Sequence, residues 1–220
     1  MTRLTIEISD SPTSIQKKID EAIRKKLSRN LDTQKILSIV KNRVQKEITE
    51  SSTWSSLLGQ GPGTLNADFG LRRGSEASRL NEILQALLSS ITLSKSATTG
   101  RGEVQRITVQ GILADFSDVR QLSSARVINK GESLPWFEWL VLRGDEQVVQ
   151  GYRIEYGRFV RSRSGRAIMI LSPSDSFSVD PSFSGTIQDN FITRAIASAI
   201  DTPVFDRLMI QEVRRALNGR

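Results

Sequence analysis

Alternation of apolar runs and turn residues is clearest in residues 136–171. Three apolar runs lie there, at Trp136–Leu142, Val148–Tyr156 and Ala167–Leu171, and Arg143–Asp145 separates the first two. Runs rich in β-branched and aromatic residues and bounded by Gly and Asp are typical of antiparallel strands joined by tight turns. The pattern therefore predicts a three-stranded antiparallel meander, with the strand that carries two tryptophans at its packing centre.

The first fifty residues predict a strand followed by helices. Residues 2–9 alternate with a period of two, which is typical of a half-buried strand. Residues 11–50 repeat apolar positions every three or four residues and predict a basic helical hairpin or extension, starting with Pro12 in the first turn or Thr13 as the cap. The predicted apolar stripe holds Ile15, Ile19, Ile23, Leu27, Ile36, Leu37, Val40, Val44 and Ile48. The cationic face holds Lys17, Lys18, Arg24, Lys25 and Lys26.

The remaining segments predict further helices, one more strand and two loops. Residues 51–76 contain several glycines and isolated apolar anchors, which predicts an ordered Gly-rich loop pinned on a neighbouring surface. Residues 94–102 are small and polar and predict a flexible loop, and residues 103–114 alternate as a strand does. Amphipathic helices are predicted at residues 77–91, 186–200 and 203–217.

This order of elements predicts the α+β class. The sheet is expected to be mostly antiparallel, built from the meander and the strands near residues 2–9 and 103–114. Amphipathic helices from both ends of the chain are expected to pack on it. We predict a single α+β domain over residues 1–220.

Missing residue types narrow the function. The 220-residue chain has no Cys and no His, which excludes disulfides, thiol chemistry, ordinary zinc sites and His-based general base catalysis. The acidic residues form no metal-ligand pattern. We therefore expect no enzyme, and no catalytic, cofactor-binding or metal-binding residue. No apolar run has the length of a membrane span, and the N-terminus lacks the apolar core of a signal peptide, so we expect a cytoplasm-like compartment and no membrane partner.

Positive charge is the main functional signal. Lys and Arg number 31 against 24 Asp and Glu, a net charge of +7, which favours contact with DNA or an acidic protein surface. The densest cationic segment leads into and through the turn between the second and third predicted strands. Its candidate contact residues for a partner or DNA are Arg153, Arg158, Phe159, Arg161, Arg163 and Arg166. The alternative for this segment is a solvent-exposed turn without a partner. For the cationic helix face, the alternative is likewise a solvated face.

Several segments over about residues 50–200 together resemble small neck and tail-completion proteins of contractile-tailed bacteriophages, including tail terminators. The segments are Trp54–Gly59, Leu65–Leu71, Leu80–Leu84, Trp136–Leu140, Ser164–Met169, Val179–Thr186 and Asp189–Ile196. Residues 13–50 lie outside this resemblance.

The resemblance implies a virion structural protein of the head–tail neck that completes or terminates the tail and joins it to the head. Such proteins form homo-oligomeric rings of six or twelve copies, with six expected here, between neighbouring neck, portal, tail-tube or sheath proteins. Adaptor, stopper, terminator and sheath-capping roles all fit it. A basic chain beside a lumen that passes DNA also fits, and the protein would be made in the host cytoplasm and reside in the virion. The alternative is a basic DNA-binding protein outside any ring.

Overall fold

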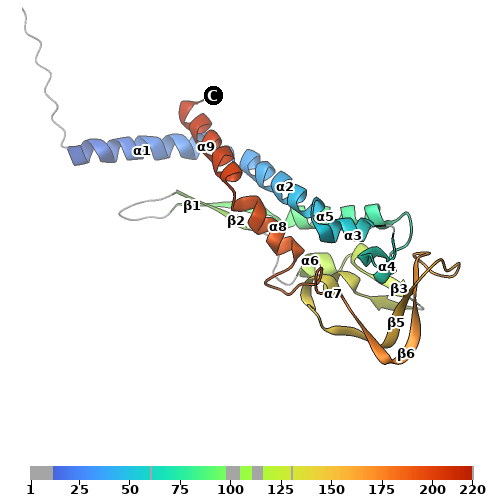
Figure 1. The fold of residues 1–220 in the computed structure, drawn as a ribbon. Helices are drawn as coiled ribbons and strands as arrows, with labels where there is room; N and C mark the ends of the chain where they lie inside the picture. The colour runs from blue at the N-terminus through green and yellow to red at the C-terminus, as the bar shows by residue number, and fades with distance from the viewer. Residues whose placement is uncertain (1–11, 60, 98–104, 111–115, 130, 220) are drawn as a thin grey trace, which may run out of the picture. The chain divides into compact units, whose positions relative to one another are not determined.

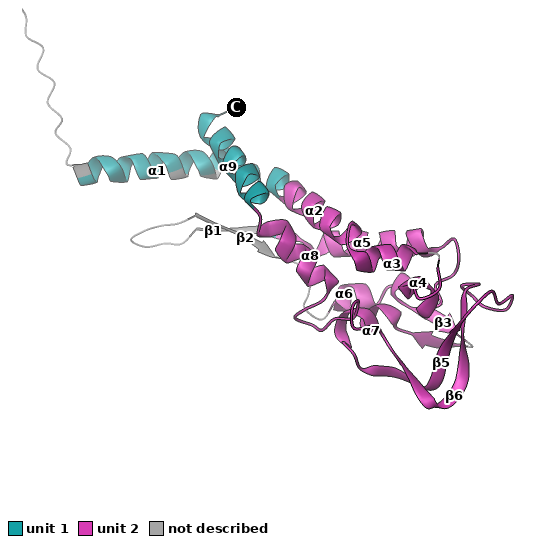
Figure 2. Ribbon diagram, viewed as in Figure 1, with its two compact units in different colours: residues 1–36, 93–108, 203–220 teal, residues 37–92, 109–202 magenta. Residues whose placement is uncertain are grey.

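The computed structural model describes residues 12–59, 61–97, 105–110, 116–129 and 131–219. Helices and antiparallel strand pairs occur together, which confirms the α+β class (Figure 1). The chain divides into two compact units (Figure 2), and the single α+β domain expected from the sequence stays a prediction. Unit 1 comprises residues 1–36, 93–108 and 203–220, and unit 2 comprises residues 37–92 and 109–202.

Unit 1 is built around two helices from opposite ends of the chain. Helix α1 (Pro12–Asn30) packs against helix α9 (Pro203–Asn218). The Asn30 side-chain amide donates to the carbonyl of Ala216 at 2.9 Å, and Lys35 pairs with the largely buried Glu212 at 2.5 Å. Helix α1 begins at Pro12, as predicted. Proline suits the first turn of a helix because a backbone N–H there has no acceptor within the helix, so its absence costs no hydrogen bond. The predicted strand at residues 2–9 lies outside the described residues.

Unit 2 holds the hydrophobic core. It takes in most of α2 (Thr33–Thr49) and the helices α3 (Ser52–Leu58), α4 (Leu65–Asp68), α5 (Glu76–Ser90), α6 (Ser117–Arg120), α7 (Trp136–Leu142) and α8 (Phe191–Ile200). Arg43 of α2 donates to the carbonyl of Ala199 at 2.8 Å and to the hydroxyl of Thr202 at 2.9 Å, which ties α2 to the end of α8. The core therefore forms between helices.

The predicted strand at Trp136–Leu142 is wrong, because this segment is helix α7. Its buried side chains are Trp136, Phe137, Leu140 and Val141, which is the spacing of one helical face. A short, continuous apolar run has no period of its own, so it can be a buried strand or a buried helix. The Trp136 indole N–H donates to the carbonyl of Ser124 at 3.0 Å, and its ring contacts those of Phe69 and Phe137. Trp136 is thus at the packing centre, but in a helix.

The predicted meander is reduced to one long antiparallel pair. Strand β5 (Gln147–Tyr156) pairs with β6 (Ala167–Ser178), with Tyr156 opposite Ala167. The register shifts between Gln150 and Tyr152, where Gly151 adopts a φ of +73° that favours glycine. The described residues contain two further strand pairs, β3 (Val127–Asn129) with β4 (Glu132–Leu134), and β1 (Thr92–Ala97) with β2 (Gln105–Gln110).

Two predicted loops also need correction. Residues 51–76 contain the short helices α3 and α4, so they are not a loop throughout. Ser51 caps α3 by accepting a hydrogen bond from the Trp54 N–H at 3.1 Å. Of the predicted loop 94–102, residues 94–97 belong to β1 and the rest lie outside the described residues. Of the predicted strand 103–114, residues 105–110 form β2, and the flanking residues lie outside the described ones.

Candidate binding site at the arginine-rich hairpin

The arginine-rich segment forms the turn that joins β5 to β6 in unit 2. At the base of the turn, the Gly157 N–H donates to the carbonyl of Arg166 at 2.8 Å. Inside the turn, the N–H of Ser162 donates to the carbonyl of Phe159 at 3.0 Å. Gly165 has a φ of +71°, which reverses the chain at a position where a side chain would be strained. The loop is therefore an ordered turn held by its own backbone.

Arg166, one of the predicted contact residues, is turned toward the protein. Its guanidinium donates to the side-chain carbonyl of Asn66 at 2.7 Å and to the carbonyl of Gly59 at 3.4 Å, and it pairs with Glu76 at 3.4 Å. Its side chain is 12% exposed, and that of Glu76 is 5% exposed. Because these groups come from α4, α5 and the loop after α3, Arg166 fastens the base of the hairpin to the helices.

The pKa of Glu76 reflects this environment. Burial alone raises the pKa of its carboxyl group, but hydrogen bonds from backbone N–H groups and Asn66, with the charge of Arg166, outweigh that effect. The pKa of Glu76 is therefore below its ordinary value, so this carboxyl group is ionised at neutral pH. Arg166 and Glu76 are structural, which corrects the assignment of Arg166 as a contact residue.

Arg163 is also partly turned toward the protein. Its guanidinium donates to the side-chain carbonyl of Asn129, the last residue of β3, at 3.3 Å. Burial, and then the nearby charge of Arg79, lower the pKa of Arg163. Arg79 in turn donates to the carbonyls of Ser123, Ser124 and Arg126 at 3.2, 3.3 and 2.9 Å. Arg79 and Arg163 thus lie close together, and both donate to neutral acceptors, Arg79 at η1 (Ser123–Ala125) and Arg163 at β3.

The other predicted contact residues are accessible. Arg153, Arg158 and Arg161 are exposed and form no hydrogen bond or ion pair with the part of the chain that the structure describes. Val160 at the tip is fully exposed. Phe159 is half-buried against its own turn, where a Cβ added to Gly157 would approach the ring carbons to 3.1 Å. Gly157 therefore leaves the space that the Phe159 ring occupies.

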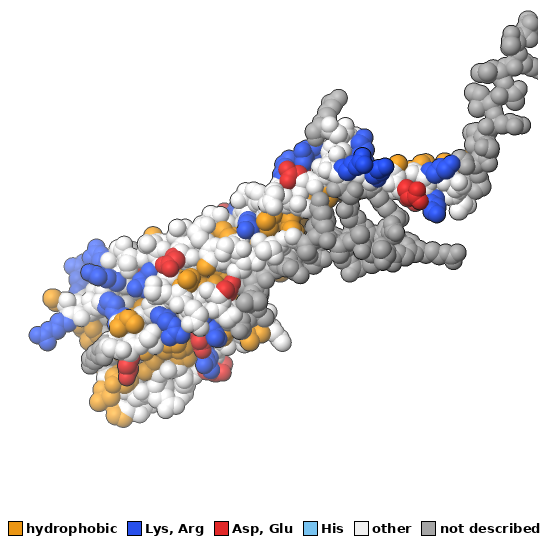
Figure 3. Space-filling view, turned by 180° about the vertical axis from the view of Figure 1, so that it is seen from behind, with side chains coloured by type: hydrophobic (Ala, Val, Ile, Leu, Met, Phe, Trp, Pro, Cys, Tyr) orange, Lys and Arg blue, Asp and Glu red, His pale blue; other side chains and the backbone are white. Residues whose placement is uncertain are grey.

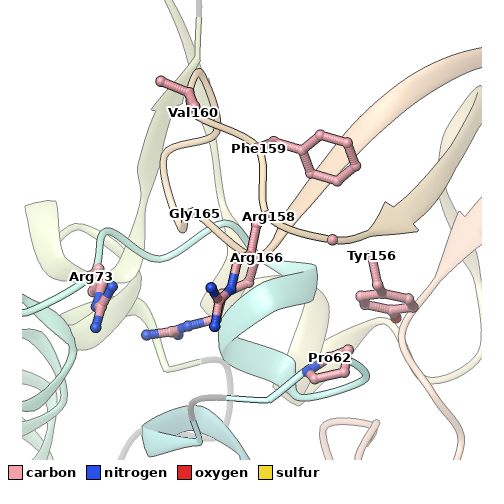
Figure 4. Close-up of a pocket in the computed structure, with 9 residues that line it drawn as sticks. Pro62, Arg73, Tyr156, Arg158, Phe159, Val160, Gly165 and Arg166 are labelled. Carbon is pink, nitrogen blue, oxygen red and sulfur yellow. The ribbon is translucent and has the colours of Figure 1, made fainter.

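A groove of about 830 Å³ opens at the base of the turn (Figure 4). Its described lining is Pro62, Arg73, Tyr156, Gly157, Arg158, Phe159, Val160, Gly165 and Arg166. Figure 4 shows the arginine side chains gathered on one side and the rings of Tyr156 and Phe159 on the other. The lining thus combines three guanidinium groups with an aromatic wall and includes no acid.

Arg73 is the residue that sequence reasoning missed. It is exposed, it lines the groove, and it forms no hydrogen bond or ion pair with the described residues. The sequence offers a weak signal, the pair Arg72-Arg73 before Gly74. Because those residues lie more than eighty positions before the turn that starts at Gly157, the pattern alone could not place them beside it.

Tyr156 connects the groove to α4. Its hydroxyl donates to the Asp68 carboxylate at 2.7 Å. Burial raises the pKa of Asp68, the bond from Tyr156 opposes this, and the charge of Asp180 adds to the rise. Burial also raises the pKa of Tyr156, together with its bond to Asp68. The Tyr156 ring is thereby anchored at one end and remains available to the groove on its faces.

The second predicted contact set is on α1. Lys17, Lys18, Lys25 and Lys26 are exposed, and the side chain of Arg24 lies outside what the structure describes. This set belongs to unit 1 and the hairpin belongs to unit 2, so they are two separate candidate surfaces. Figure 3 shows Lys and Arg side chains over both units.

Comparisons identify no relative and add no function. No family model, curated protein or solved structure matches the chain. Among the described residues, no group of three or more Asp, Glu, Cys or His could hold a metal ion, and no helix is long and apolar enough to cross a membrane. The candidate site therefore rests on the geometry of this chain alone.

Proposed function

We propose that the protein is a virion structural component of the bacteriophage head–tail neck. In this role it forms a homo-oligomeric ring that completes or terminates the tail and joins it to the head, in contact with portal, tail-tube or sheath proteins. The segments over residues 50–200 that resemble neck and tail-completion proteins support the choice of class. The structural observation that carries the assembly role is the uncovered apolar stripe of helix α1.

Helix α1 is amphipathic in sequence, but its apolar stripe is not buried in the single chain. None of the described side chains of α1 is buried, and Ile19 and Ile23 are 47% and 41% exposed. Helix α9 likewise exposes Val204 and Ile210. Helices in water depend on packing of their apolar face for most of their stability. We therefore infer that a neighbouring copy covers this stripe, which gives the heterologous contact that closes a ring.

Light scattering coupled to size-exclusion chromatography, followed by negative-stain microscopy, tests the proposal. We expect rings, and we expect the double variant I19S/I23S to weaken association at least about tenfold because two apolar contacts are lost. The matched control is K17S/K26S, which changes exposed lysines of the same helix and keeps the stripe. A wild-type chain that stays monomeric at high concentration, without rings, would refute the assembly role.

The second candidate is a DNA-binding protein that works outside a ring. The observation that favours it is the exposure of Arg153, Arg158 and Arg161 without an acidic partner among the described residues. Contacts to phosphates make affinity fall steeply with salt. Charge reversal at these three positions should then abolish binding to duplex DNA and leave any ring intact. Rings that bind no DNA would reject this candidate.

A further inference from the structure

The groove at the base of the hairpin has the features of a ligand site. Arg73 and Arg158 enter it from segments far apart in the chain, and neither has a partner among the described residues. Two unpaired guanidinium groups in one concave site repel each other, and a concave, partly apolar wall strengthens their field. An anion bound between them removes this repulsion. The charge of the site therefore favours a ligand with a negative group.

Arg166 has a structural role in the site and is not assigned to the ligand. Its donors are engaged by Asn66, Gly59 and Glu76, and its charge is matched by Glu76. This arrangement holds the start of β6 in place beside Arg158. Arg73 lies between α4 and α5, the two helices to which Arg166 is hydrogen-bonded. The backbone segments that carry Arg73 and Arg158 are therefore held together by the bonds of Arg166.

The aromatic wall adds a second kind of recognition. Tyr156 is held through its hydroxyl by Asp68, and Phe159 is held against Gly157. Both rings line the groove. Aromatic faces stack on nucleobases, whereas guanidinium groups bind phosphate through paired hydrogen bonds. The volume of about 830 Å³ is within the range of small-molecule pockets and too small for a duplex.

We propose that this groove binds a nucleotide, with the phosphate on Arg73 and Arg158 and the base against Tyr156 and Phe159. The nucleotide can be free or part of a single strand, since both present the same phosphate and base. The site goes beyond the neck role and does not depend on ring formation, because all the residues that form it lie in unit 2 of one chain.

Fluorescence anisotropy with the full-length protein and a short labelled oligo-dT tests the site. We expect R73Q/R158Q to weaken binding at least about tenfold, since both charged hydrogen-bond donors to the phosphate are lost. The matched control R72Q/R214Q removes the same charge from exposed arginines that do not line the groove and are not candidate DNA contacts, and we expect a loss below about threefold. F159A keeps all charges and should weaken oligo-dT binding at least about fivefold through lost stacking.

Competition identifies the source of the nucleotide. Displacement of the probe by dTMP but not by inorganic phosphate supports a free nucleotide, and displacement only by unlabelled oligo-dT supports a strand.

Equal losses in the two double variants would show non-specific attraction and overturn the proposal. Arginine-dependent binding of an oligoglutamate peptide, without oligo-dT binding, would also overturn it and assign the groove to an acidic protein segment. No binding of any probe at low salt would reject the site. Particle mass measured in the same samples separates loss of the site from loss of the ring.

Discussion

Helices α1 and α5 carry the same kind of apolar stripe, yet the two units of the chain treat it differently. In unit 2, the stripe of α5 is buried at Leu80, Ile83, Leu84, Leu87 and Leu88. In unit 1, the apolar residues that the structure describes as buried are Leu31, Ile36 and Ala216, and none of them is in α1. The same sequence pattern thus corresponds to a buried core in unit 2 and to a solvent-exposed apolar surface in unit 1.

The two units also differ in the interactions that hold them together. Unit 2 has aromatic packing around Trp136 and the hairpin fastened by Arg166, whereas α9 is joined to α1 by the hydrogen bond from Asn30 and to Lys35 by the ion pair of Glu212. A hydrogen bond from Lys35, and then one from Arg215 together with both positive charges, hold the pKa of Glu212 below its ordinary value against burial. An ion pair of the half-exposed Lys35 adds little stability compared with burial of an apolar face.

The largest effect is expected from Leu87→Ala in α5. Leu87 is fully buried, so its truncation leaves a cavity and should lower the free energy of unfolding by about 2–5 kcal/mol. Urea unfolding followed by tryptophan fluorescence measures this, because all three tryptophans lie in unit 2. A loss below about 1 kcal/mol would mean that the core of unit 2 is not well packed there.

The next effect is expected from Arg166→Gln. The variant leaves Glu76 buried without its partner, and we expect a loss of about 3 kcal/mol of unfolding free energy. Adding Glu76→Gln should recover part of that loss, whereas Arg161→Gln, on the exposed tip, should change stability by less than about 0.5 kcal/mol. Equal effects of Arg166→Gln and Arg161→Gln would contradict the structural role of Arg166.

The same pair predicts a pH dependence. Because the pKa of Glu76 is lower in the folded chain, its stabilising contribution is full above the ordinary glutamate pKa, about 4.3, and is lost as pH falls through the lowered value. The double variant R166Q/E76Q should lack this part of the acid-induced loss in urea unfolding at a series of pH values. An unchanged pH profile would contradict the lowered pKa.

A smaller effect is expected from Asp68→Asn. The raised pKa of Asp68 means that the folded chain binds its proton more tightly, so stability falls as pH rises from the ordinary aspartate pKa through the raised value. The variant should remove this fall and change the unfolding free energy at neutral pH by about 1 kcal/mol or less. Tyr156→Phe serves as the comparison, since it removes the hydrogen bond to Asp68 but keeps the carboxyl group.

The smallest effect on folding is expected from Ile23→Ala in α1, the counterpart of Leu87→Ala. Ile23 is already 41% exposed, so we expect a change below about 1 kcal/mol in the unfolding of unit 2. Association measured by light scattering should weaken instead. A large loss of tryptophan-monitored stability would show that α1 supports the core and would remove the contrast between the units.

Sequence reasoning succeeded where a periodic pattern and a local rule agree. The start of α1 at Pro12, the helix α5 and the turn between β5 and β6 all follow from spacing and turn residues. It failed at Trp136–Leu142, where a continuous apolar run has no distinguishing period. It also failed at Arg166, because a cluster of arginines in sequence does not show which of them finds an acid elsewhere.

By itself, the sequence determined the α+β class, the positive charge, the amphipathic helices and the absence of Cys and His chemistry, because these depend on composition and on contacts between near neighbours. Tertiary structure decided which stripe is buried, which arginines remain free and that Arg73 joins Arg158 in one groove. Those outcomes depend on side chains far apart in the chain, and only the folded backbone sets the distances between them.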